Sequence, residues 1–424
     1  MLSQLKQAWR IKDVRKKILY TLMMIAVFRI GATIPVPGVD TSIIKEMVGK
    51  NSLLSLYNMF TGGAFSSFTL FALGIGPYIT ASIILQLLTI GFESLDELQK
   101  SGEEGKKKIN KYTKYTALAL AFVQAIGITL GVIKSFGALK SDNVFFISTI
   151  ILTLVSSSML LMWIGDKITE KGLGNGSSVI IFVGIVSRVP SDVISTINMV
   201  QNGSLAIWAA VMLAVVILLT ITAVTYIQEA TRKIPVQYAK RVVGRKMYGG
   251  QSSHIPMKVN QSGVIPVIFA SSLLAFPQTI AMFMGADAQN FVQTYLTPNG
   301  DIGFWIYRSL EVLLIVFFAY FYTTVSFNTE DIANNMKNNG GFIPGIRPGK
   351  PTIDYLNRIL SRLTLAGAIF LAIISLIPAF ATHYMNVSMS LAGTSLLIVV
   401  GVALELKRQL ESNLVMRNYQ GFLK

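Results

Sequence analysis

The sequence contains no cysteine, few charged residues and only two histidines, and each scarcity removes a class of function. Without cysteine the chain forms no disulfide and offers no thiolate metal ligand. His254 and His383 lie far apart, so no histidine-rich metal site is indicated. Charged residues make up 14% of the chain, against about 25% in ordinary soluble domains. With hydrophobic residues at 52%, this composition indicates an integral membrane protein.

The centres of the long apolar segments also lack ionisable side chains, and those present, such as Arg308 and Glu311, fall near segment ends. Pumps and ion-coupled carriers usually keep carboxylates or histidines at mid-membrane, where a charge is costly and is retained for function. GLGNG at 172–176 lacks the following Lys and Ser or Thr of a phosphate loop. The sequence therefore argues against an enzyme, a bound cofactor and an ion-driven carrier.

Ten apolar segments are candidate membrane spans, because a helix needs roughly 20 apolar residues to cross a hydrocarbon core of about 30 Å. Two of them, 74–90 and 175–190, are short and begin beside glycines. The sequence therefore predicts an all-α polytopic membrane protein with ten transmembrane helices. The predicted spans are 18–34, 74–90, 114–134, 144–165, 175–190, 206–228, 263–284, 304–327, 361–381 and 390–406.

Lysine and arginine are distributed unevenly among the connections. Both termini and the connections at 91–114, 166–174, 229–262 and 328–362 hold 30 of the 37 basic residues, and the alternate connections hold five. Basic loops stay on the cytoplasmic side of a membrane. The alternation predicts that both termini are cytoplasmic, and it explains most of the net charge of +16 without nucleic acid binding.

One segment, SLYNMFTGGAFSSFTL at 55–70, is half hydrophobic and too short in its apolar part to cross a membrane. Irregular backbone at membrane depth is tolerated only where protein or a water-filled cavity surrounds it. Other segments, such as GIGPYITASII at 74–84, place small residues beside β-branched aliphatics. Ordinary helix packing explains any one of them, whereas together with the broken segment they suggest helices around a closable passage.

Two long motifs stand out, SLLSLYNMFTGGAFSSFTLFALGIGPYITASIILQLL at 52–88 and GDKITEKGLGNGSSVIIFVGI at 165–185. They resemble the two signatures of the SecY family, the channel subunits of the Sec protein translocon. Further matches at 238–272, 338–352 and 392–400 extend the resemblance over essentially the whole chain. The resemblance implies a protein-conducting channel that translocates unfolded preproteins across a bacterial plasma membrane and releases transmembrane segments sideways into lipid.

The resemblance also implies two inverted halves of five spans, 1–195 and 196–424, that open like a clamshell. A short re-entrant plug helix at about 55–66 would fill the external side of the channel. The implied plug residues are Leu56, Tyr57, Asn58, Met59, Phe60, Thr61, Gly62 and Gly63. The implied pore ring consists of Ile75, Ile79, Ile181, Ile268 and Ile398.

The lateral gate that the family implies is the seam between the second span and the seventh and eighth spans. There the chain would bind signal sequences and give transmembrane segments access to membrane lipids. Four polar residues are candidates for setting its closing tendency, and hydrogen bonding between neighbouring helices is an equal alternative. They are Thr80, Gln86, Gln124 and Gln278.

The partners that the family implies are the subunits SecE and SecG, the motor ATPase SecA and the ribosome. The docking residues would lie in the basic loops, although a solvated loop explains the charge alone equally well. They are Lys240, Arg241, Arg245, Lys246 and Arg347.

Two other classes compete with this interpretation. A secondary transporter is also built from inverted repeats with broken helices, but it needs a polar or ionisable site at mid-membrane. A scramblase or an insertase without a pore needs an open hydrophilic groove, against which the isoleucine-rich segments argue.

Overall fold

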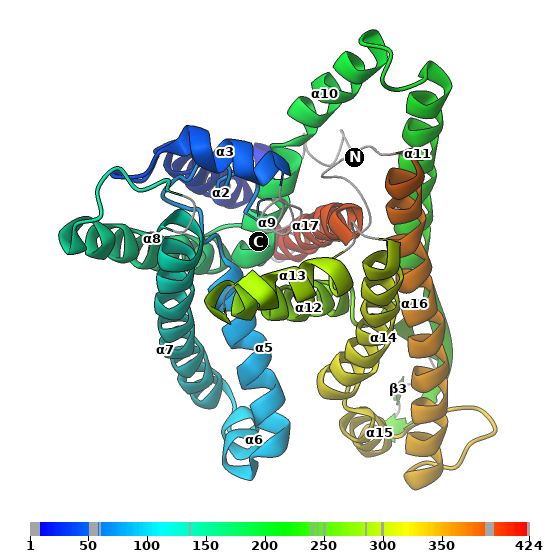
Figure 1. The fold of residues 1–424 in the computed structure, drawn as a ribbon. Coiled ribbons are helices and arrows are strands. Elements are labelled where there is room, and N and C mark those ends of the chain that lie inside the picture. The colour runs from blue at the N-terminus through cyan, green and yellow to red at the C-terminus, as the bar shows by residue number, and fades with distance from the viewer. Residues whose placement is uncertain are drawn as a thin grey trace.

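The structure is a computed structural model that describes residues 9–50, 58, 61–134, 137–238, 241–243, 246–248, 252–284, 286–297, 301–385 and 394–421. Long helices dominate it (Figure 1). They are α2 (Lys12–Gly31), α3 (Thr41–Lys50), α5 (Gly76–Gly91), α6 (Glu93–Lys100), α7 (Glu103–Ile126), the π-helix η1 (Gly127–Lys134), α8 (Val144–Lys171), α9 (Gly176–Val186), α10 (Val189–Gln201), α11 (Ile207–Glu229), α12 (Ile265–Met284), α13 (Ala286–Tyr295), α14 (Asp301–Ser326), α15 (Thr329–Asn338), α16 (Lys350–Met385) and α17 (Thr394–Gly421).

Each of the ten predicted spans coincides with at least one helix, so the prediction of an all-α polytopic membrane protein is confirmed. Two of the spans differ in detail. The predicted span 175–190 is divided between α9 and α10, and the span 114–134 ends in η1 rather than in an α-helix. Six stretches of the described chain are long and apolar enough to cross a membrane by themselves, namely Glu103–Lys134, Val144–Lys171, Gly176–Gln201, Ile207–Glu229, Ile302–Asn338 and Lys350–Ala381.

The helix α5 is too short to cross alone, because its 16 residues extend only about 24 Å. Together with α6 it forms a pair bent by 104° that would count as a seventh span. The backbone before α5, residues 61–75, runs through turns rather than a helix. The prediction that a broken segment and a short span follow one another is therefore confirmed for the described residues.

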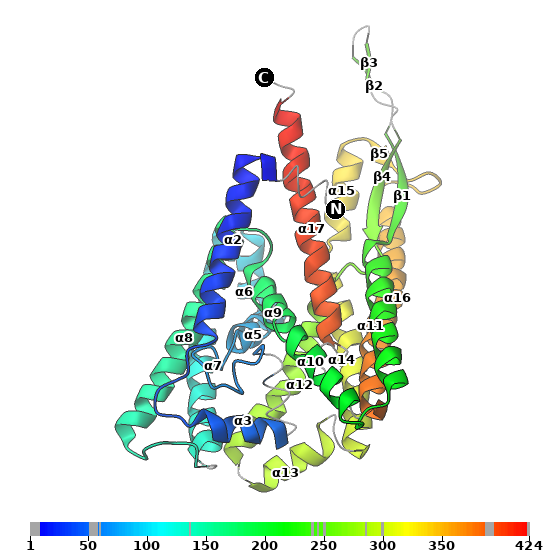
Figure 2. The ribbon, with the colours of Figure 1, turned by 90° about the horizontal axis from the view of Figure 1, so that it is seen from above.

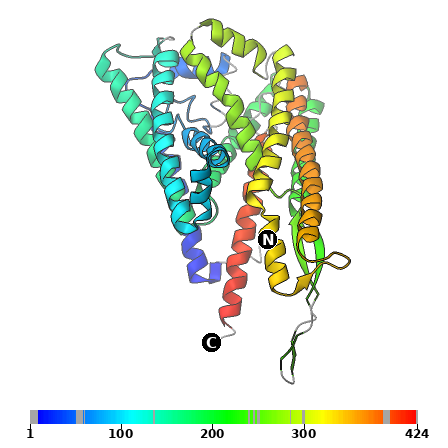
Figure 3. The same cartoon turned by 90° about the horizontal axis from the view of Figure 1, so that it is seen from below.

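The helices form two groups with a line of contact between them. α2, α7, α8 and α9 pack together on one side, and α11, α12, α14 and α16 on the other. α12 also packs against α5 and η1, and α17 packs against both α9 and α11 (Figures 2 and 3). The predicted boundary at 195/196 falls inside α10, the largely exposed helix that leads from α9 to α11. The inverted relation of the halves stays a prediction.

A small sheet is an element that the sequence did not predict. β1 (Thr231–Tyr238) pairs with β4 (Ser252–Lys258) and β5 (Gly341–Phe342), and β2 (Arg241–Val243) pairs with β3 (Lys246–Tyr248). Ile234 and Val236 alternate with exposed neighbours and pack on α15 and on the start of α16. The two long basic connections thus form one folded unit, at the end of the molecule to which the start of α2 and the end of α17 also point (Figure 2).

One carboxylate lies deeper in the membrane part than the sequence predicted. Glu311 is ten residues from the start of α14, about 15 Å along the helix, and its side chain is 2% exposed. It accepts hydrogen bonds from Arg308 Nη1 at 2.5 Å and from Ser375 Oγ at 2.6 Å. The expectation that all ionisable side chains lie near span ends is wrong at this position. The buried carboxylate is tolerated because these two partners neutralise and solvate it.

The contact of α8 with α9 depends on two glycines. A Cβ atom on Gly176 would lie 1.8 Å from the carbonyl oxygen of Gly165. Asn175 caps α9 by accepting hydrogen bonds from the amides of Ser177 and Ser178. The turn at GLGNG therefore opens α9 and fixes how closely α9 approaches α8.

We expect Gly176→Ala to destabilise the protein by about 1–3 kcal/mol, because the added methyl group overpacks a backbone contact. Thermal unfolding in detergent measures the change. Gly91→Ala is the matched control, since a Cβ at Gly91 meets no atom within 4 Å. Its expected change is below about 1 kcal/mol. Equal unfolding temperatures for the two variants would contradict the packing argument.

Candidate functional site

The five predicted pore isoleucines come from four helices and are brought into one region. Ile75, which immediately precedes α5, packs in one apolar cluster with Ile79 and Ile181. Ile181 also belongs to a second cluster, with Ile268 of α12 and Ile398 of α17. Ile75 and Ile398 are 6% and 2% exposed, and the other three are half-buried. Ile181 therefore links all five side chains into a continuous apolar region between the two helix groups.

The part of the predicted plug that the structure describes lies beside this region. Gly62 has φ +65°, and a Cβ there would lie 2.6 Å from the Cα of Gly184 in α9. Asn58 is buried, and its side-chain oxygen accepts a hydrogen bond from the Ser66 amide at 2.8 Å. The segment is thus held against α9 by a contact that only glycine permits.

The predicted helical form of the plug needs a correction at its end. Residues 61–66 form turns, because Gly62 and Gly63 both have positive φ values that end a right-handed helix. Thr61 is buried, and its hydroxyl donates to the carbonyl of Asn58 at 3.1 Å. The predicted plug residues Leu56, Tyr57, Met59 and Phe60 lie outside the described residues.

The seam between the helix groups is the contact of α12 with α5 and η1. Two of the polar residues predicted to control it bond within their own helix. Thr80 donates to the Gly76 carbonyl at 3.1 Å, and Gln86 donates to the Ser82 hydroxyl at 3.2 Å. Gln124 is buried at the end of α7, and the side chain of Gln278 lies outside the described residues. The observed bonds of Thr80 and Gln86 do not cross the seam.

Comparison with known proteins identifies the family. The family model SecY matches residues 69–407. The protein translocase subunit SecY of Streptomyces galbus is 44% identical over 444 aligned positions, which cover 100% of both chains. The chain belongs to the SecY family. Its fold resembles a solved structure described as that of a protein-conducting channel, with a TM-score of 0.71, 20% identity and coverage of 94% of this chain and 92% of that one. It also resembles Sec61 in a canine ribosome-channel complex from the endoplasmic reticulum, with a TM-score of 0.67, 19% identity and coverage of 94% and 92%.

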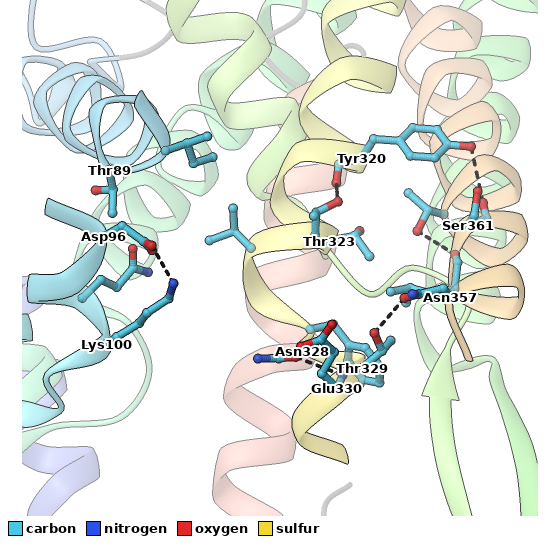
Figure 4. A pocket seen from close by; sticks show the side chains of 17 residues that line it. Thr89, Asp96, Lys100, Tyr320, Thr323, Asn328, Thr329, Glu330, Asn357 and Ser361 are labelled. Carbon is cyan, nitrogen blue, oxygen red and sulfur yellow. Dashed lines mark hydrogen bonds and ion pairs between the residues drawn. The ribbon is translucent and has the colours of Figure 1, made fainter. Parts of the chain in front are cut away.

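This SecY-family chain has a cavity of about 670 Å³ between α5 and α6 on one side and α14, α15 and α16 on the other (Figure 4). Thr89, Asp96 and Lys100 line the first side, and Lys100 Nζ lies 2.6 Å from Asp96 Oδ2. Hydroxyl and amide side chains dominate the second side, among them Thr323 and Asn357. The cavity lies between the second predicted span and the eighth, where the lateral gate is predicted.

The sequence did not single out these cavity residues, although it contains a signal for them. The run YFYTTVSFNTE at 320–330 places hydroxyl and amide groups at the end of an otherwise apolar span. Thr323 is buried and donates to the Ala319 carbonyl, and Thr329 donates to Asn357 at 2.7 Å. Such clustering of hydroxyls in the last turns of a span indicates a wet or polar neighbour rather than lipid.

Three of the predicted docking residues, Arg241, Lys246 and Arg347, lie in the folded unit of β1 to β5 or beside it. Arg347 is exposed in the connection from β5 to α16, and its carbonyl accepts a hydrogen bond from the Thr352 hydroxyl at 2.9 Å. Arg241 and Lys246 lie in the strands β2 and β3, with side chains outside the described residues. Lys240 and Arg245 lie outside them altogether. Arg347 is thus carried by a short, hydrogen-bonded connection rather than by a free loop.

We expect Ile79→Asn and Ile398→Asn to raise the ion conductance of the resting protein in planar bilayers, because a polar side chain wets a constriction that apolar side chains keep dry. Ile234→Asn is the matched control. Ile234 is 2% exposed in the cluster under the sheet, away from the five isoleucines and from residues 61–75, so its replacement lowers stability without opening a path for ions. Unchanged conductance in both ring variants would count against the assignment.

Proposed function

We propose that this SecY-family chain is a protein-conducting channel that passes unfolded preproteins across the membrane and releases transmembrane segments into lipid. The observation that carries the proposal is the convergence of five isoleucines from four helices between the two helix groups. Isoleucine has a stiff χ1 angle and forms no hydrogen bonds, so it makes a rim that closes around varied chains without binding any of them. A narrow apolar rim also excludes ions, because they lose hydration in it.

In this proposal the segment at 55–66 is the plug that closes the channel at rest. The close contact of Gly62 with Gly184 supports it, since the segment fits against α9 without any side chain between the two backbones. Asn58 and Thr61 supply hydrogen bonds that hold the segment together. Displacing the plug therefore separates one compact piece from α9 rather than unfolding it.

The seam of α12 with α5 and η1, continued by the cavity beside α14, is the proposed lateral gate. A signal sequence or nascent transmembrane helix leaves through it when its transfer free energy into lipid is favourable. Thr89 and Thr323 make the cavity polar at one end of the seam, while Ile79 and Ile268 make its middle apolar. A segment with an apolar centre and a polar flank is complementary to a seam that is apolar in its middle and polar at one end.

The proposed partners follow from the same family membership. They are the subunits SecE and SecG, the motor ATPase SecA, the ribosome, signal sequences and membrane lipids. The proposed orientation places both termini and the unit of β1 to β5 in the cytoplasm of a bacterium, with the chain in the plasma membrane. We assign no catalytic activity to the chain, and its energy source in the proposal is SecA or the ribosome.

A secondary transporter remains the competing function, and Glu311 is the residue that it would need. Its carboxylate already accepts hydrogen bonds from Arg308 and Ser375, so both of its oxygens are occupied. The ion pair with Arg308 lies within α14, the hydrogen bond from Ser375 joins α14 to α16, and together they leave no free carboxylate for a coupling ion. The structure of this site therefore favours a structural role for Glu311.

The experiment that tests the proposed function is reconstitution of the chain with SecE and SecG in liposomes. We expect an unfolded preprotein to become protease-protected only when SecA and ATP are present. Uptake of a small solute without SecA, and no protection of the preprotein, would instead support the transporter.

Charge reversal by Arg347→Glu is expected to reduce SecA-driven transport by tenfold or more, because the exposed guanidinium would lose an acidic or phosphate partner (about 1.4 kcal/mol for each factor of ten). Lys140→Glu is the control with the same charge change, since Lys140 is exposed beside α3, at the other end of the molecule (Figure 2). Both variants should keep the unfolding temperature of the parent. Normal transport by Arg347→Glu would remove this residue from the docking surface.

A further inference from the structure

The π-helix η1 holds a buried hydroxyl that the fold leaves without a partner. Thr129 is 0% exposed, and its Oγ1 forms no hydrogen bond. Leaving a buried hydroxyl unpaired is costly, so a native protein that does so has a specific reason. The reason here lies in the local helix geometry.

Six other buried threonines, all beyond the first turn of their helices, satisfy their hydroxyls in one common way. Each donates to the carbonyl four residues earlier, at 2.7 to 2.9 Å, as α-helix geometry allows. They are Thr21, Thr89, Thr113, Thr220, Thr323 and Thr364. For Thr129 that carbonyl belongs to Ala125, and the wider i to i+5 turn of η1 moves it out of reach. An α-helical turn at this position would restore the bond.

Side-chain packing opposes that restoration. Ile128 and Ile133, five residues apart, are 2% and 0% exposed in the same apolar cluster. Residues five apart lie over one another in a π-helix, whereas in an α-helix they point in clearly different directions. Rewinding η1 as an α-helix would therefore remove one of these isoleucines from the cluster. The resting state keeps the packing and gives up the hydrogen bond of Thr129.

The neighbours of η1 connect it to both the proposed gate and the proposed plug. The cluster that holds Ile128 and Ile133 also contains Phe65 and Phe68, which lie two and five residues after Gly63 of the proposed plug. η1 also packs against α12 across the seam. The same eight residues thus contact the proposed gate on one side and the base of the proposed plug on the other.

We propose that η1 is a conformational relay between gate and plug. It is a π-helix while α12 packs against it, and it rewinds to an α-helix when α12 moves away. Rewinding pairs Thr129 Oγ1 with the Ala125 carbonyl and turns Ile133 away from Phe65 and Phe68, which loosens the segment that carries the plug. The opening of the seam and the release of the plug are then one event. This inference rests on the proposed channel function.

The decisive variant is Thr129→Val, which keeps the shape of the side chain and removes the unpaired hydroxyl. We expect it to stabilise the resting state, with an unfolding temperature about 2 °C higher in detergent. We also expect the open probability in bilayers, with a synthetic signal peptide present, to fall about fivefold, because rewinding no longer gains a hydrogen bond. Thr129→Ser keeps the hydroxyl and should behave like the parent protein.

The matched control is Thr113→Val in α7, the helix that continues into η1. Its hydroxyl bonds to the Ile109 carbonyl at 2.9 Å, so its removal should lower the unfolding temperature and leave the open probability unchanged. The proposal is overturned if Thr129→Val also lowers the unfolding temperature, or if its open probability equals that of the parent. A parent protein that conducts no ions with signal peptide would refute the channel function, while the unfolding temperatures would still test the strain at Thr129.

A structure of the complex with a signal sequence in the opened seam provides the direct test. We expect residues 127–134 to be α-helical there, with Thr129 Oγ1 bonded to the Ala125 carbonyl. A π-helix that persists after α12 has moved would refute the relay.

Discussion

The packing of α12 against α5 and η1 is the contact on which the rest of the structure depends. It is the place where the two helix groups meet away from α17, and it closes the region in which the five isoleucines converge. Ile268 of α12 shares an apolar cluster with Ile181 and Ile398. A channel that must both seal and open sideways needs such a contact to be apolar and reversible. Here apolar side chains supply the attraction, and the observed hydrogen bonds of Thr80 and Gln86 stay within α5.

The membrane interior imposes a second constraint, since every backbone polar group there needs an internal partner. The segment from 61 to 75 meets it with consecutive turns, in which the amides of Ala64, Phe68 and Ala72 each donate to a carbonyl three residues earlier. Glycine makes the remaining close contacts, as where Gly62 meets Gly184 and Gly176 meets Gly165. A helix at Gly62 would carry this backbone away from α9. The turns therefore explain how a segment that cannot span is still accommodated between spans.

The sequence predicted the helices well and their interruptions poorly, for a physical reason. Apolar length and the alternation of basic loops depend on local composition, so they revealed all ten segments and the common side of the chain's two ends. The break between α9 and α10 and the π-turns of η1 depend on tertiary packing, as the burial of Ile128 and Ile133 in one cluster illustrates. The sheet was missed because Ile234 and Val236 alternate over only a short stretch of a basic connection. Likewise, the sequence did not reveal that Glu311 is buried with a partner, because Ser375 of α16 is distant in sequence.

The sheet and the cavity, neither of which the sequence predicted, are joined by one helix. α16 is a single helix of 36 residues, about 54 Å long. Leu356 and Ile359 of its first half belong to the core under the sheet, and Leu371 and Ile374 of its second half belong to the core shared with α12 and α14. Between these positions, Asn357 and Ser361 line the cavity beside the seam. One continuous helix therefore joins the connection that carries Arg347 to a wall of the cavity, with packed side chains in both of its halves.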